Sequence, residues 1–187
     1  MSTTPLDRAG PWRFDELLGR DDLPDDGCRY EVVDGHLVVT TPPAHRHQLA
    51  GAVLFRQLRD ACPEHWLVAW EFALPLGTDG RVPDLAVVHA GSPTGQGPYP
   101  RGPEAFGLVV EVMSPSSRKT DLFAKPGEYA EAGIPLFWRL DLDPEPLLHA
   151  FTLADGRYAE VATVRGDGIV PVPWGELTVD LGPIPER

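Results

Sequence analysis

Two acidic residues lie in segments that are otherwise apolar. Glu111 interrupts the run Gly107-Leu-Val-Val-Glu-Val-Met, and Asp84 interrupts the run Val82-Pro-Asp-Leu-Ala-Val-Val. Both runs are typical of buried strands, and a buried carboxylate is costly unless it is paired or binds a cation. If the two strands are neighbours in one sheet, both carboxylates lie at the same end of that sheet.

Two adjacent carboxylates form an oxygen-rich site that suits Mg²⁺ or Mn²⁺. Such an ion polarises a phosphoryl group and lowers the pKa of bound water. The alternative is structural: Asp84 caps a turn, and Glu111 pairs with an arginine such as Arg139 on a neighbouring strand. Both interpretations remain open for either acid considered alone.

Only two of the 16 lysine and arginine residues are lysines, Lys119 and Lys125. Chemistry that needs an ammonium group therefore has two candidates. Proline is favourable in the first turn of a helix, so Pro126 predicts that a helix begins near Lys125. Lys119 lies in the loop Ser116-Ser-Arg-Lys-Thr, where phosphate contact or solvation is the expected role.

Several spaced motifs of the chain resemble the Uma2 family, a family of unknown function placed in the PD-(D/E)XK nuclease superfamily. The resemblance runs from about residue 12 to residue 180. The matching segments are Tyr30-Glu-Val-Val-Asp-Gly-His, His47-Gln48, Pro83-Asp84, Val110-Glu-Val-Met-Ser-Pro-Ser-Ser117, and the block from Asp121 to Asp141.

The resemblance implies that Asp84 and Glu111 are the two acidic positions of the nuclease motif, on neighbouring strands. With the Val112 carbonyl they would hold the metal ion. The position two after Glu111, where the motif has lysine, is Met113 in this chain, and methionine cannot orient a water molecule. Lysine normally does so, and stabilises the charge that develops on the phosphoryl group.

A lysine on the following helix could supply the missing ammonium group. The spacing of Lys125 and Tyr129 resembles such a migrated lysine, which favours Lys125 over Lys119. A surface lysine at a chance position is the alternative for Lys125.

The resemblance also implies that the first core helix contributes a polar residue to the site, and His47 or Gln48 stands at its start. We expect His47, and Glu31 on the preceding strand, to be further catalytic candidates. A cap or a solvated side chain is the alternative for His47. His45 and His47 would form a metal pair for which no third ligand is identifiable.

Hydrophobic periodicity and turn residues predict the elements that must position these side chains. The long helix between residues 44 and 61 is expected to place Leu49, Val53, Leu54 and Leu58 on one stripe. The expected helices are 12–18, 44–61 and 121–132, and the expected strands are 28–33, 36–40, 66–76, 82–89, 107–113, 136–142, 147–153, 157–164 and about 169–180, with a loop at 91–103.

This order predicts a mixed α/β (α+β) fold: a restriction-endonuclease-like central mixed sheet flanked by helices, with an N-terminal β-hairpin and a β-rich C-terminal extension. Its 187 residues fit a single domain, residues 1–187, with a core at about 12–180 and flexible termini. The net charge of −12 excludes a histone-like nucleic-acid binder.

The sequence shows no secretory signal and no apolar run of about 18 residues, so we expect a cytoplasmic protein without a membrane partner. Cys28 and Cys62 are expected to be reduced thiols without a role. The resemblance alone implies a homodimer.

The sequence therefore predicts a metal-dependent endonuclease that uses Mg²⁺ or Mn²⁺ to hydrolyse phosphodiester bonds in DNA. The alternative is a catalytically inactive nuclease-fold protein that serves binding or assembly, favoured by the net charge and by Met113. A small-molecule hydrolase ranks last, because the chain lacks a nucleophile elbow and a recognisable triad.

Overall fold

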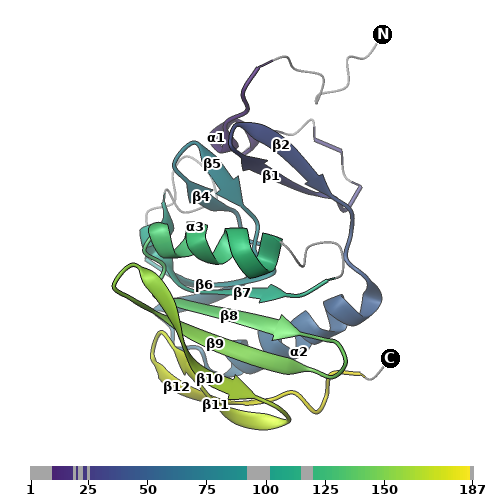
Figure 1. Ribbon diagram of the computed structural model, residues 1–187, viewed down its shortest axis with the longest axis vertical. Helices are drawn as coiled ribbons and strands as arrows, with labels where there is room; N and C mark the ends of the chain where they lie inside the picture. Colours follow the sequence, from purple (N-terminus) through teal and green to yellow (C-terminus); the bar gives the residue numbers. More distant parts are fainter. Residues whose placement is uncertain are drawn as a thin grey trace.

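The computed structural model describes residues 10–18, 20, 23–24, 26–91, 102–114 and 120–185. A six-stranded sheet with the order β10-β9-β8-β7-β6-β3 lies beside a four-stranded sheet with the order β2-β1-β5-β4 (Figure 1). The six strands are β3 (Trp66–Trp70), β6 (Leu85–His89), β7 (Phe106–Val112), β8 (Leu136–Asp141), β9 (Leu147–Ala154) and β10 (Arg157–Val164). The four strands are β1 (Arg29–Val33), β2 (His36–Thr40), β4 (Leu74–Leu76) and β5 (Asp79–Arg81).

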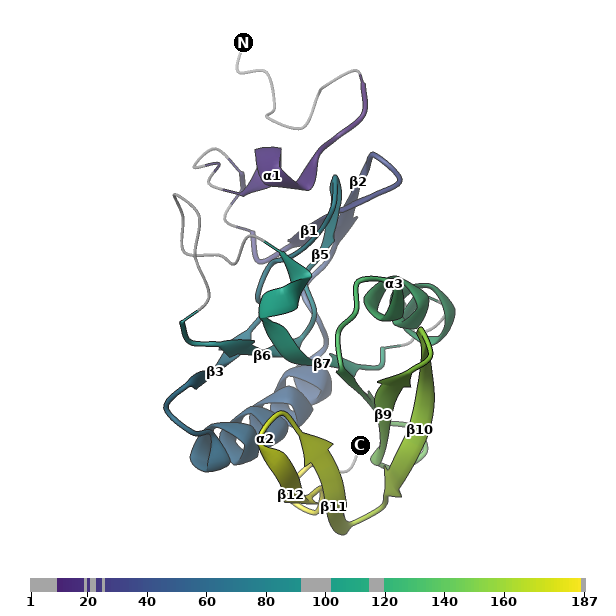
Figure 2. The same ribbon diagram turned by 90° about the vertical axis from the view of Figure 1, so that its left-hand side faces the viewer.

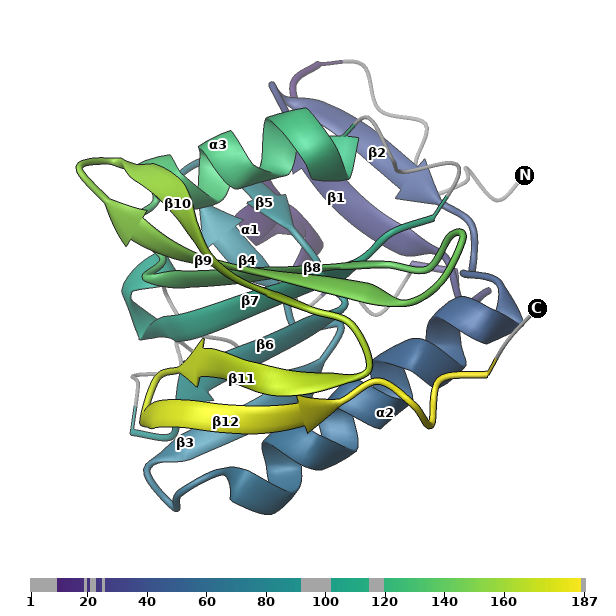
Figure 3. The same ribbon diagram turned by 60° about the horizontal axis from the view of Figure 1, so that its bottom comes forward.

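Helices α2 (His45–Ala61) and α3 (Lys125–Glu131) and a third, two-stranded sheet cover the faces of the six-stranded sheet (Figures 2 and 3). Leu54 shares one core cluster with Val110 and Val170, whereas Tyr129 packs with Val109 in a second cluster. Consecutive strand residues point to opposite faces, so α2 and β11 cover one face and α3 covers the other. The remaining elements are α1 (Phe14–Leu17), η1 (Pro103–Ala105), η2 (Thr120–Ala124), β11 (Asp167–Val172) and β12 (Gly175–Asp180).

The predicted mixed fold, the N-terminal hairpin and the β-rich C-terminal extension are confirmed. Asp34 and Gly35, with φ values of 50° and 71°, form the turn between β1 and β2. Strands β7 and β8 are parallel, with η2 and α3 between them, and all residues of β7 are buried. The predicted start of a regular helix at Lys125 is also confirmed.

The strand predicted at 66–76 is divided between the two large sheets, whereas the strand predicted at 82–89 begins only at Leu85 and lies wholly in the six-stranded sheet. Strand β3 pairs with β6 in the six-stranded sheet, while β4 pairs with β5 in the four-stranded sheet. The break lies at Glu71, whose φ of 46° is incompatible with a continuing strand, and whose backbone N–H donates to the Asp84 carbonyl at 3.0 Å. Asp84 thus lies where the chain passes from one sheet to the other.

Two further predictions require correction. The segment 169–180 is not one strand but parts of β11 and β12, because the chain turns between Val172 and Gly175. Leu49 is 37% exposed and does not belong to the buried stripe of α2. That stripe consists of His47, Ala50, Gly51, Leu54 and Leu58.

Most of the expected loop at 91–103, and Lys119, lie outside the described residues. Among the described residues, none of the helices combines the length and the apolar character that a bilayer crossing demands.

Candidate active site

The sheet register brings the two predicted acids together. Leu85 of β6 lies opposite Val110 of β7 in an antiparallel pair. Asp84 comes directly before Leu85 and Glu111 directly after Val110. Because the two strands run in opposite directions, both acids therefore lie at the same end of the sheet. Their exposed fractions are 3% and 1%, so both carboxylates need partners inside the protein.

Asp84 accepts hydrogen bonds from three directions. The Arg29 side chain donates to Oδ1 at 2.8 Å, and the backbone N–H of Val112 donates to Oδ2 at 2.7 Å. His47 Nε2 lies 3.3 Å from the same Oδ2. Burial raises the pKa of the Asp84 carboxyl, but His47, Arg29 and Lys125 outweigh it, and the pKa falls well below its ordinary value. Asp84 is therefore an anion.

Glu111 has two partners on the helix that covers this face of the sheet. Lys125 Nζ lies 2.9 Å from Oε2, and the Tyr129 hydroxyl donates to Oε1 at 2.6 Å. These two residues are four positions apart on α3, so their side chains share one face of the helix. Burial and the nearby Glu111 hold the pKa of Tyr129 well above its ordinary value, and the phenol remains a donor.

His47 connects α2 to β7, the strand that carries Glu111. Its Nε2 lies 2.7 Å from the Val112 carbonyl oxygen as well as beside Asp84. Burial lowers the pKa of His47, but Asp84 outweighs it and the pKa is raised. The buried Nδ1 has no hydrogen-bond partner among the described residues, so a proton there would lack an acceptor. Nε2 is accordingly the nitrogen that donates.

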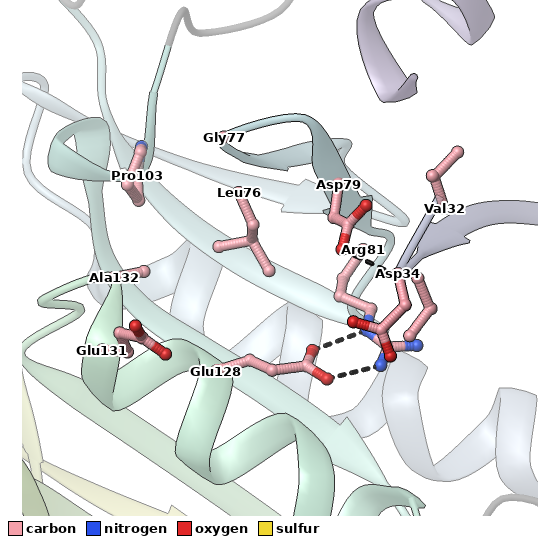
Figure 4. A pocket seen from close by; sticks show the side chains of 11 residues that line it. Val32, Asp34, Leu76, Gly77, Asp79, Arg81, Pro103, Glu128, Glu131 and Ala132 are labelled. Atoms are coloured by element: carbon pink, nitrogen blue, oxygen red, sulfur yellow. Dashed lines mark hydrogen bonds and ion pairs between the residues drawn. The ribbon is translucent and has the colours of Figure 1, made fainter. Parts of the chain in front are cut away.

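Glu31 lies in the same region, but its oxygens are bonded elsewhere. Oε1 accepts from the backbone N–H of Val82 at 2.8 Å, and Oε2 accepts from Arg81 at 3.2 Å. Arg81 also donates through Nε and Nη2 to the two oxygens of Glu128, both at 2.7 Å (Figure 4). Glu128 follows Lys125 by three positions on α3, so Arg81 connects β1 and β5 to the helix that carries the ammonium group.

A pocket of about 580 Å³ opens above these groups. It lies between the β1–β2 hairpin, the start of α2 and the start of α3. The charged residues that line it are Arg29, Glu31, Asp34, His47, Glu71, Arg81, Asp84, Glu111, Lys125 and Glu128. The buried acids, the ammonium group and the imidazole therefore meet at one solvent-reached cavity.

Among the sequence candidates, Asp84, Glu111, Lys125, His47 and Glu31 all line this pocket. His45 and Gln48 do not line the pocket; both are exposed at the start of α2. Since residues two apart on a helix point to different sides, the proposed His45 and His47 metal pair does not form.

Sequence reasoning missed Arg29, Glu71, Arg81 and Glu128. Arg29 lies 2.8 Å from both Glu71 and Asp84. The only available signal was an arginine and a glutamate two residues apart in a β-strand, Arg29 and Glu31, which places both side chains on one face of β1.

The oxygen atoms at the site fit a hard divalent cation. Asp84 Oδ2 and the Val112 carbonyl oxygen lie within 3.3 Å of the same His47 nitrogen, so these two oxygens are close together, and Glu111 adds a second carboxylate in the same pocket. Among the described residues, no group of three His, Cys, Asp or Glu side chains is arranged to hold a metal. An ion here would have two carboxylates, one carbonyl and water as ligands.

The sequence model of the Uma2 family, described as "Putative restriction endonuclease", matches residues 15–180. The fold is similar to that of a crystal structure from Anabaena variabilis ATCC 29413, described as a "putative nuclease belonging to DUF820". The TM-score is 0.69 at 18% sequence identity, and the match covers 93% of this chain and 97% of the other.

At that identity the structural similarity establishes a shared fold. The search of curated proteins found no match. The family match spans nearly the whole length of the chain, including both acid strands and α3, and on this ground the chain belongs to the Uma2 family.

Proposed function

We propose that the protein is a metal-dependent endonuclease that hydrolyses phosphodiester bonds in DNA. The observation that carries this proposal is the convergence of Asp84, Glu111 and the Lys125 ammonium group at one pocket. Two carboxylates and an ammonium group are a suitable set for activating water beside a phosphoryl group. Membership of a family described as "Putative restriction endonuclease" supports the same chemistry.

Asp84, Glu111 and the Val112 carbonyl would hold Mg²⁺ or Mn²⁺. When bound, the ion would supply Lewis-acid polarisation of the phosphoryl oxygen and a lower pKa for bound water. The Val112 N–H keeps the Asp84 carboxylate against the backbone of β7, which orients it. The Tyr129 hydroxyl holds the other carboxylate by Oε1.

Lys125 would position the attacking water and stabilise the negative charge that develops on the phosphoryl oxygens. Its ammonium group reaches Glu111 from α3, at 2.9 Å, although the position two after Glu111 is the buried Met113. The water-orienting group is thus proposed to come from the helix and not from the strand. His47 would donate a hydrogen bond at the Val112 carbonyl, and Glu31 would act through Arg81.

A cleavage assay tests this proposal. Wild type, Asp84→Asn and Lys125→Met are incubated with labelled DNA in Mg²⁺, in Mn²⁺ and in a chelator. Wild type is expected to cut only with metal, and each substitution to lower the rate by about 10²-fold or more. Asp167→Asn, an exposed change at the start of β11, is the control. Metal-dependent cleavage that survives both site substitutions would refute the proposal.

A second candidate is a binding or assembly protein that retains the fold without turnover. One observation favours it: Arg29 and Lys125 themselves balance the charges of Asp84 and Glu111. This candidate predicts that wild type binds DNA in the presence of metal and leaves it intact. The cleavage assay, run beside a binding assay on the same DNA, separates the two.

A further inference from the structure

Arg29 is only partly engaged by the protein. Its Nη2 donates to Glu71 Oε1 and to Asp84 Oδ1, both at 2.8 Å. Nε and Nη1 form no hydrogen bond with any residue that the structure describes. The side chain is 15% exposed and lines the pocket above Asp84. Three N–H groups of a guanidinium therefore remain available at the candidate active site.

The second arginine of the pocket provides the contrast. All three nitrogens of Arg81 are used: Nε and Nη2 bond Glu128, and Nη1 bonds Glu31. Its side chain is only 4% exposed. Arg81 thus uses all its nitrogens to link Glu31 to Glu128, whereas Arg29 keeps N–H donors, unused by the described residues, for a ligand in the pocket.

The charge and the orientation of Arg29 are both fixed. Burial lowers the pKa of the guanidinium, but Asp84 and Glu71 outweigh it and hold the pKa far above its ordinary value. Because Nη2 is bonded to carboxylates of two different segments, the plane of the guanidinium is held before any ligand arrives. Less side-chain entropy is then lost on binding.

We propose that Arg29 binds a phosphate group of the substrate strand through Nε and Nη1. Guanidinium groups form strong, charge-assisted hydrogen bonds to phosphate oxygens. The group bound is a phosphodiester of nucleic acid lying beside the one that is cut. This inference rests on the proposed nuclease function and assigns the site one phosphate contact that the two acids and the lysine do not supply.

The test measures DNA binding without metal, so that cleavage does not enter. Fluorescence anisotropy follows a labelled oligodeoxythymidine as it binds wild type, Arg29→Gln, Arg29→Lys and Arg157→Gln in a chelator at several salt concentrations. Arg157, exposed at the start of β10, is the matched control.

Arg29→Gln is expected to weaken binding about tenfold, as for one lost charge-assisted hydrogen bond. The slope of log affinity against log salt should become shallower by about 0.7, as for one lost phosphate contact on a single strand. Arg29→Lys should retain part of the affinity, because it keeps the charge but not the planar donor group. Arg157→Gln should bind as wild type does.

An affinity and salt slope for Arg29→Gln equal to those of wild type would overturn the inference, as would a wild type that binds no oligonucleotide at low salt. Circular dichroism checks that Arg29→Gln is folded. If it is not, Arg29→Lys decides, since an unchanged affinity in that variant contradicts a role for the planar guanidinium. Wild type that binds DNA through Arg29 but fails the cleavage assay would refute the nuclease proposal and leave only the phosphate contact of Arg29 standing.

Discussion

Each carboxylate of the candidate site is balanced by a cation from a different part of the chain. Arg29 of β1 pairs with Asp84, and Lys125 of α3 pairs with Glu111. Removing one partner of a buried pair leaves an uncompensated charge, which costs far more than the net contribution of the intact pair. Substitutions at these residues therefore change stability as well as chemistry, and the two effects have to be measured separately.

Tyr129→Phe tests the hydrogen bond to Glu111. The substitution removes a donor to a buried carboxylate and should lower the free energy of unfolding by about 1.5–3 kcal/mol, measured in urea. Tyr158→Phe is the control, because that hydroxyl donates at 2.8 Å to a neutral acceptor, the Ile134 carbonyl. It should cost only about 0.5–1.5 kcal/mol. An equal or larger loss for Tyr158→Phe would contradict this assignment.

The lowered pKa of Asp84 predicts an acid limb in the stability of the protein. A carboxyl whose folded pKa is depressed stabilises the fold above its unfolded pKa of about 3.9, and this contribution disappears as the pH falls through the folded pKa. Asp84→Asn should therefore be less stable than wild type at neutral pH, and the difference should narrow below about pH 4.

Urea unfolding at several pH values measures this difference. Asp167→Asn, which changes an exposed carboxyl, should follow the wild-type curve. A gap between wild type and Asp84→Asn that stays constant down to about pH 2 would contradict the depressed pKa.

At the scale of elements, Arg81 holds the four-stranded sheet against α3. It bonds Glu31 of β1 and Glu128 of α3 from its own strand β5. Through Arg81, the four-stranded sheet, which carries Arg29, holds α3, the helix that carries Lys125. The position of the ammonium group depends on this contact as well as on the packing of Tyr129.

Arg81→Gln should lower the free energy of unfolding by about 3–5 kcal/mol, since it leaves the buried Glu31 carboxylate without its cation. Amide hydrogen exchange in α3 should accelerate. Arg13→Gln, which breaks an exposed pair with Asp15, should leave stability almost unchanged. Adding Glu128→Gln to Arg81→Gln should cost less than it does in wild type; strict additivity of the two changes would refute the coupling.

Local sequence signals predicted most elements, and the failures have two causes. Asp34-Gly35 and the apolar run to Val112 identify the first hairpin and the buried strand by local rules. The bend at Glu71 depends on a non-local contact with the Asp84 backbone, which no local pattern contains. The turn before Gly175, by contrast, does have a local signal, the Pro and Gly residues within 169–180.

The candidate site could be predicted only in part: its acids and its lysine have a signal in the sequence, and its arginines do not. Acids in apolar strands stand out because burial makes them costly, so Asp84 and Glu111 could be found from the sequence. Lys125 could be selected because the chain has only two lysines. Arg29 and Arg81 could not be distinguished from the other arginines, since their importance arises from partners more than 40 residues away in the chain.

For the whole molecule, the net charge of −12 opposes binding to a polyanion. The pocket concentrates the cations Arg29, Arg81 and Lys125 at one place, but the acids around them balance their charge. We therefore expect weak affinity for DNA in the absence of metal, with a shallow dependence on salt because few phosphates are contacted, and recognition that relies on the site itself more than on a broad basic surface.

A Mn²⁺ titration followed by electron paramagnetic resonance tests most directly whether Asp84 and Glu111 form the proposed metal centre. Wild type should bind one ion, Asp84→Asn and Glu111→Gln should lose it, and Lys125→Met should retain it, because the lysine is not a ligand. Absence of saturable binding by wild type at millimolar Mn²⁺, or binding that survives both acid substitutions, would contradict the account.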